Sequence, residues 1–206
     1  MMQGALPFDW PAAESEQDFI VSDANQLAVR HFAHWSLWPV PVTILTGPRK
    51  SGRSFLGRIF AGRSGATLID NAERADEEAI FHAWNRAQAE HRPLLLIADA
   101  PPPAWQVTLP DLASRLAATP QIAISEPDDA LMTALIERLL VARGLPIGPG
   151  VARWIADRIE RSYVGIHRAI DALDAAAWSR RGRIGTGFAR DALIAAAVIE
   201  DSSKEA

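Results

Sequence analysis

The residues with the clearest chemical pattern stand between positions 42 and 61. A short, apolar and β-branched run, Val42-Thr43-Ile44-Leu45-Thr46, predicts a buried strand, and Phe55 to Ala61 has the pattern of a helix. Between them lies Gly47-Pro48-Arg49-Lys50-Ser51-Gly52-Arg53-Ser54. Strand, glycine-rich loop and helix in this order are typical of a phosphate-binding loop, where backbone N–H groups and the helix N-terminus hold phosphate oxygens. We expect nucleotide contacts from Gly47, Lys50, Gly52, Arg53 and Ser54.

The cation of this loop is unusual. Arg53 stands where phosphate-binding loops carry lysine, and its planar guanidinium keeps the charge but suits a different phosphate geometry. The Ser54 hydroxyl is available to a Mg²⁺ ion. The alternative interpretation is a glycine-rich turn between a strand and a helix that holds no ligand.

Two acidic residues close neighbouring predicted strands. Asp70 ends the run Thr67-Leu68-Ile69 and is suited to orient the water shell of a Mg²⁺ ion, while Asp99 ends Leu94 to Ala98 and could sense the far phosphate of ADP or ATP. The alternative for each acid is a solvated strand end or a helix cap. Asn71, rather than glutamate, follows Asp70, which favours metal-assisted nucleotide binding over rapid hydrolysis.

The elements around these residues predict an α/β fold. Apolar strands near 42–46, 66–70, 94–99 and 121–125 alternate with helices, a pattern that indicates a parallel sheet covered on both faces. After Pro127 the strands cease and four helices follow. We therefore expect an extended tail over 1–16, an α/β domain over 17–127 and an all-α lid over 128–206.

Composition limits the classes of function. The chain has 206 residues and a formal net charge of −4, with no cysteine, so a disulfide framework and a thiolate zinc site are excluded. Its acidic balance argues against direct sequence-specific DNA binding, which needs a basic surface. Apolar runs are short and broken by charges, so we expect a cytoplasmic protein without a membrane span.

Several segments resemble one family. A phosphate-binding loop, acid-ended strands and a helical lid follow the plan of the AAA+ ATPases. Within them, Leu109-Pro110-Asp111-Leu112-Ala113-Ser114-Arg115-Leu116 resembles the arginine-finger segment of the DnaA/Hda branch, and 47–54, Asp23–Ala28 and Leu95–Pro102 are also similar to that branch. The resemblance covers residues 3 to about 199.

The resemblance implies a role for Arg115. In this branch the matching arginine is offered across a subunit interface to the ATP held by the replication initiator DnaA, where a guanidinium stabilises charge on the transferring phosphoryl group. The protein would then activate hydrolysis by DnaA without turnover of its own. The alternative for Arg115 is a surface ion pair with Asp111, four residues earlier.

The N-terminal segment resembles a second family feature. Gln3, Leu6 and Phe8 are spaced as in the short peptide that docks bacterial proteins on the DNA polymerase sliding clamp. An extended segment of this kind places apolar anchors in a pocket while glutamine hydrogen-bonds to the rim. The alternative is a tail that binds nothing.

Two departures from the family pattern bear on function. Only fifteen residues separate Ser54 from Asp70, so we expect the sheet to be one strand short. The lid stretch that matches the family's sensor arginine is Tyr163-Val164-Gly165, and Arg161 or Arg168 would have to replace it. The sequence thus leaves three functions open: a clamp-docked regulator of DnaA, an autonomous P-loop ATPase or phosphotransferase, and a nucleotide-free adaptor. It also leaves self-association open.

Overall fold

The centre of the fold is a four-stranded parallel sheet with the strand order β2-β3-β1-β4. The computed structural model of the chain describes residues 19–178 and 182–200. Its strands are β1 (Val42–Thr46), β2 (Thr67–Ile69), β3 (Leu94–Ile97) and β4 (Gln121–Ala123). Every residue of β1 and β3 is buried, as the continuous apolar runs predict. The α/β class and the parallel sheet expected from the sequence are confirmed.

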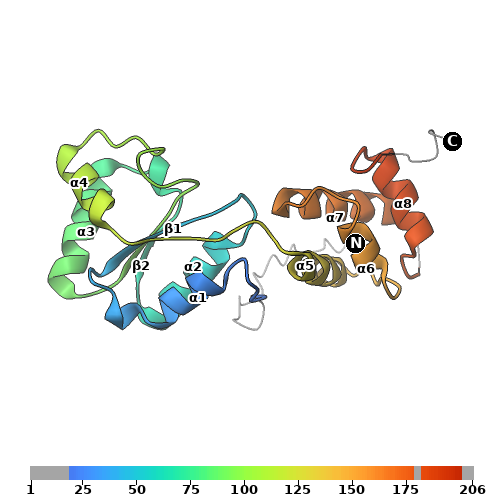
Figure 1. Cartoon of the computed structure of the whole chain (residues 1–206), viewed down its shortest axis with the longest axis horizontal. Helices are drawn as coiled ribbons and strands as arrows, with labels where there is room; N and C mark the ends of the chain where they lie inside the picture. The colour runs from blue at the N-terminus through green and yellow to red at the C-terminus, as the bar shows by residue number, and fades with distance from the viewer. Residues whose placement is uncertain (1–18, 179–181, 201–206) are drawn as a thin grey trace, which may run out of the picture.

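Helices cover both faces of the sheet (Figure 1). Alternate residues of β3 point to opposite faces: Leu95 and Ile97 pack with α1 (Gln26–Ala33) and α2 (Arg53–Ser64). Leu94 and Leu96 pack with α3 (Glu77–Glu90) and α4 (Pro110–Ala118). Two short 3₁₀ turns, η2 (Trp35–Leu37) and η3 (Ala72–Arg74), complete this part of the chain.

The sheet is short at one edge, as the spacing of Ser54 and Asp70 predicts. α2 ends at Ser64, Gly65 adopts a left-handed conformation, and β2 begins two residues later at Thr67. Within the described residues no strand lies between α2 and β2, so β2 is the edge strand beside β3. The expected loss of one strand is confirmed.

The remaining helices form a separate all-α layer. They are α5 (Asp129–Ala142), α6 (Val151–Ala156), α7 (Tyr163–Ala177) and α8 (Thr186–Ala195), which we call the lid. They share a core of their own, in which Ile136, Leu140, Ile170 and Leu193 are fully buried. The lid lies to one side of the sheet and its flanking helices (Figure 1). Among the described residues, no helix is long and apolar enough to cross a membrane.

Tyr163 joins the lid to the sheet. It begins α7, yet its side chain is buried in the apolar cluster between the sheet, α1 and α2. Its hydroxyl donates a hydrogen bond to the Ser125 carbonyl just after β4 (3.1 Å). Burial, and then the charges of Glu126 and Asp128, raise the pKa of Tyr163 to about 12.

Candidate nucleotide-binding site and arginine face

The glycine-rich loop joins the end of β1 to the start of α2 and packs closely on Ile124, the residue after β4. A Cβ on Gly47 would lie 2.8 Å from the Ile124 carbonyl oxygen, closer than real Cβ atoms approach. Gly52 has φ 85° and precedes the first residue of α2, a left-handed conformation that favours glycine. Lys50 is also left-handed, with φ 66°. The first backbone N–H groups of α2 lack intrahelical acceptors, so the loop presents donors where an anion can bind.

Ser51 is a site residue that the sequence reasoning missed. Its side chain is buried, and its hydroxyl has no hydrogen-bond partner among the residues that the structure describes. A buried hydroxyl without a partner costs about 1–3 kcal/mol, which a ligand oxygen would recover. Its position between Lys50 and Gly52 in the loop motif was the available signal.

Arg53 is engaged at the end of β3. Its guanidinium donates to the Ala98 carbonyl and to the Asp99 carboxylate, the latter at 2.5 Å, and its side chain is 12% exposed. The hydrogen bond from Arg53 lowers the pKa of the Asp99 carboxyl; the charges of Arg53, Arg49 and Arg74 also lower it, while desolvation opposes them. The structure thus brings together two residues that were predicted to bind nucleotide, Arg53 and Asp99, but they bind each other.

Ser54 and Asp70 are the residues expected to hold Mg²⁺. Ser54 lies in the first turn of α2, and Asp70 follows β2, two strands away from β1. Two strand spacings amount to roughly 10 Å, so Asp70 would contact a Mg²⁺ at Ser54 only through water, a mode that this ion favours. The Asp70 carboxylate accepts a hydrogen bond from the Asn71 backbone (2.9 Å). In the described part of the chain, no group of three or more His, Asp or Glu side chains is arranged to bind a metal.

A cleft of about 230 Å³ opens between the loop and the lid. Lys50, Ser51, Gly52 and Phe55 line it from the loop and α2, and Leu135, Tyr163 and Ile166 are among the apolar residues that line it from the lid. The volume is below the roughly 300–1,000 Å³ of pockets that enclose whole ligands. An apolar cleft beside a row of N–H donors suits a nucleotide whose planar base lies in the cleft and whose phosphates extend onto the loop.

The positively charged lid residues at this cleft are not the ones predicted from the sequence. The stretch Tyr163 to Gly165 was predicted to match the family's sensor arginine, and a Cβ on Gly165 would lie 2.5 Å from the Glu160 carbonyl oxygen. Arg161 forms an exposed ion pair with Asp129 on α5. Neither Arg161 nor Arg168 lines the cleft.

Arg138 of α5 and His167 of α7 do line the cleft. Both come from the lid. Burial lowers the pKa of His167, as do the charges of Lys50 and Arg143, against an opposite effect of Asp171. The lowered pKa reduces the positive charge that His167 adds near Lys50.

Arg115 lies on a different surface, formed by α3 and α4 at the side of the sheet away from the lid (Figure 1). Its guanidinium donates to the Asn85 side chain and lies over two rings, 4.3 Å from the centroid of Phe81 and 4.6 Å from that of Trp84. These α3 contacts take the place of the ion pair with Asp111 that was the alternative. We call this surface the arginine face.

Glu77 holds α4 in position from the start of α3. Its carboxylate accepts hydrogen bonds from the backbone of Thr108 (2.9 Å) and Leu109 (2.7 Å) and from the Thr108 hydroxyl (2.9 Å). Leu109 precedes α4 and has no side-chain cap of its own, so Glu77 supplies the cap from another helix.

The residues predicted to bind the sliding clamp, Gln3, Leu6 and Phe8, lie outside the described residues.

The cap makes stability dependent on pH. The hydrogen bonds from Thr108 and Leu109 lower the pKa of Glu77 from its ordinary 4.5, so its contribution is present above that value and is lost as pH falls through the lowered pKa. We expect Glu77→Gln to lower the urea midpoint near pH 7, with the gap to the parent protein closing towards pH 3. Glu78→Gln, one residue along the same helix, is the control with a small gap throughout. A difference in urea midpoint between Glu77→Gln and the parent protein that does not change with pH would contradict the capping role of Glu77.

Comparisons with known proteins identify the fold. No protein-family model matches the chain. An uncharacterized protein of Haemophilus influenzae is 30% identical over 118 residues, covering 57% of this chain and 51% of that protein. The chain therefore spans about half the length of this curated relative.

Among solved structures, domain III of the replication initiation protein DnaA from Thermotoga maritima has a TM-score of 0.72 at 13% identity, covering 91% of this chain and 98% of that one. AMPPCP-bound DnaA from Aquifex aeolicus has a TM-score of 0.63 at 15% identity, covering 89% and 68%. The Holliday junction branch migration motor RuvB from Thermotoga maritima has a TM-score of 0.63 at 14% identity, covering 88% and 72%. This chain has the fold of the AAA+ ATPase domains of DnaA and RuvB.

Proposed function

We propose that this protein is a regulator of chromosome replication initiation of the Hda class, which stimulates ATP hydrolysis by DnaA through Arg115. The observation that carries the proposal is the arginine face: a half-buried guanidinium held by Phe81, Trp84 and Asn85, on the opposite side of the sheet from the chain's own cleft. The resemblance of residues 109–116 to an arginine-finger segment and the DnaA-like fold support it.

The chemistry needed from Arg115 is electrostatic. A guanidinium brought to the ATP of a neighbouring molecule stabilises the negative charge on the oxygens of the transferring phosphoryl group and takes no proton itself. Phe81 and Trp84 limit the rotamers open to Arg115, and Asn85 fixes the plane of its fork. Holding the side chain in this way lowers the entropy cost of presenting it to a partner.

The direct test is hydrolysis by ATP-loaded DnaA in the presence of clamp-loaded DNA. We expect Arg115→Ala to remove the stimulation, a loss of about 10³-fold or more, since arginine fingers contribute this much. Arg115→Lys keeps the charge without the fork and should stay strongly impaired. Arg153→Ala, which removes an exposed arginine of the lid, is the control and should stimulate normally. Full stimulation by Arg115→Ala would contradict the role.

Clamp docking is the second part of the proposal. Gln3, Leu6 and Phe8 would bind the polymerase sliding clamp, and this contact would bring the protein to DNA despite a net charge of −4. We expect Leu6→Ala combined with Phe8→Ala to abolish retention of the protein on immobilised clamp. Ala12→Ser combined with Ala13→Ser, in the same segment, should leave retention unchanged. Retention of the first variant would refute this docking site.

Nucleotide binding is the third part. ADP or ATP would place its phosphates on the loop from Gly47 to Ser54 and its base in the cleft, with residues 17–127 as the nucleotide-binding domain and 128–206 as the lid. A Mg²⁺ ion held by Ser54 and, through water, by Asp70 would neutralise phosphate charge. Ser51 would donate its unpartnered hydroxyl to a phosphate oxygen.

A nucleotide-free adaptor is the second candidate, and the Arg53–Asp99 ion pair favours it. While Asp99 neutralises Arg53, the loop offers less positive charge to a phosphate. Calorimetry with ADP separates the two. If the loop binds nucleotide, Asp99→Ala should tighten ADP binding by about tenfold, equivalent to about 1.4 kcal/mol, and Arg53→Ala should weaken it. Absence of ADP binding by both the parent protein and Asp99→Ala would support the adaptor.

A further inference from the structure

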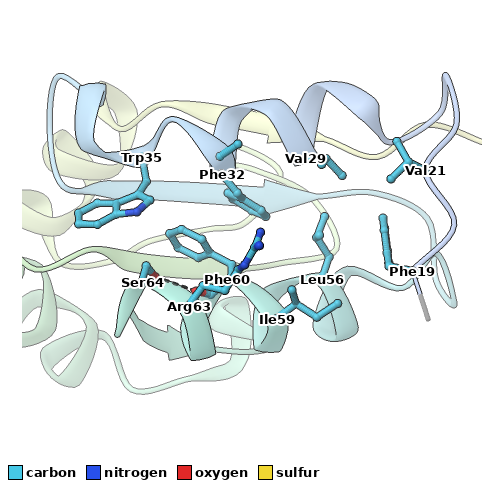
Figure 2. Close-up of a pocket in the computed structure, with 11 residues that line it drawn as sticks. Phe19, Val21, Val29, Phe32, Trp35, Leu56, Ile59, Phe60, Arg63 and Ser64 are labelled. Atoms are coloured by element: carbon cyan, nitrogen blue, oxygen red, sulfur yellow. Dashed lines mark hydrogen bonds between the residues drawn. The ribbon is translucent and has the colours of Figure 1, made fainter. Parts of the chain in front are cut away.

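An apolar groove runs between α1 and α2 (Figure 2). It lies on the face of the sheet opposite the arginine face. Val29, Phe32 and Trp35 line it from α1 and η2, and Leu56, Ile59 and Phe60 line it from α2. Its volume of about 390 Å³ exceeds that of the cleft beside the glycine-rich loop. We call it the α1–α2 groove.

The groove is closed at its base by buried aromatic rings and exposes apolar surface at one end. Phe32 and Phe60 stack at 4.7 Å between ring centroids and are almost fully buried, so the floor is preformed. At one end Val21 keeps 56% of its surface exposed. Apolar surface gathered in a groove of this size marks a place where another apolar group binds.

The course of the chain points to an occupant. Phe19, the first described residue, lines the same end of the groove as Val21 and packs on Phe55 at 6.0 Å between ring centroids. Eighteen residues precede it. The groove extends along α2 from Leu56 to Ser64, roughly 12 Å at 1.5 Å per residue. Nine residues can span up to roughly 30 Å, so the segment just before Phe19 has ample length to lie in the groove.

The composition of that segment matches the groove. Trp10 is the large apolar residue nearest to Phe19, and Pro11 after it favours an extended backbone at Trp10. Residues 9–18 carry four acids, Asp9, Glu14, Glu16 and Asp18, and no lysine or arginine. α2 carries three arginines and no acid, and one of them, Arg63, lines the groove and extends from α2 towards α1 (Figure 2). The segment therefore offers an apolar side chain to an apolar groove and negative charges to the arginines of α2.

We propose that the α1–α2 groove binds residues 9–18 of the same chain, with the Trp10 indole as the apolar anchor between α1 and α2. The acids of the segment then face the Arg63 side chain on α2. Gln3 to Phe8 would emerge beyond the groove, free to bind another protein. The inference does not depend on the proposed function, because it needs neither a clamp nor a nucleotide.

The absence of cysteine gives a direct test on the full-length protein. Ala12→Cys provides a single site for a nitroxide label, whose effect on methyl NMR signals reports proximity. We expect the label to broaden the methyl signals of Val29, Leu56 and Ile59 in the groove and to leave those of Leu140 and Ile170 in the lid core sharp. Adding Trp10→Ala should restore the groove signals.

A variant on the groove side provides the matched control. Ala33 lines the groove and is exposed, so Ala33→Trp would fill the groove and should also release the labelled segment. Ala176→Trp, at an exposed position of α7, should leave the broadening intact. Groove signals that stay sharp in the labelled parent protein would overturn the proposal. Broadening that appears when labelled protein is mixed with isotopically labelled, cysteine-free protein would also overturn it, because the occupant would be a second copy.

Discussion

The structure depends on the complete burial of its two central strands. Every residue of β1 and β3 is buried, and parallel strands of this kind must be connected by crossovers that return to the same edge. The carboxyl ends of β1, β2 and β3 therefore open onto one edge of the sheet. That constraint gathers the glycine-rich loop, Asp70 and Asp99 without any ligand. It also places α4, which follows β3, on the face that carries Arg115.

One of the positive charges at the loop is neutralised within the protein. Asp99 meets Arg53, while Lys50 lies near the half-buried His167, whose pKa is lowered in part by that lysine. A phosphate ligand would have to compete with Asp99 for the guanidinium, although the loop N–H groups and the Ser51 hydroxyl stay available to it. The arginine face differs, because Arg115 is held by neutral partners, an amide and two aromatic rings. Its positive charge is therefore not cancelled by a carboxylate in the contacts that hold it.

Sequence patterns predict the periodic parts of this protein well. The strands were predictable because Val42–Thr46 and Leu94–Ile97 are continuous apolar runs, and the missing strand followed from the short spacing of Ser54 and Asp70. The partners of the charged side chains were not predictable. Arg53 meets Asp99 across 46 positions and Arg115 meets Asn85 across 30, distances over which spacing carries no signal. Arg138 was missed for the same reason, since its place beside the cleft arises only from the packing of the lid against the loop.

The contact of Gly47 with Ile124 has a consequence for the evolution of the loop. Any side chain at that position would collide with the Ile124 backbone, and Gly52 needs its left-handed conformation to start α2. Both glycines are thus required for the chain to fold, whatever the loop binds. Selection for folding alone would preserve the two glycines after nucleotide binding had weakened. The cation at position 53 is under no such backbone constraint, so a loss of nucleotide binding would alter that position more readily than the two glycines.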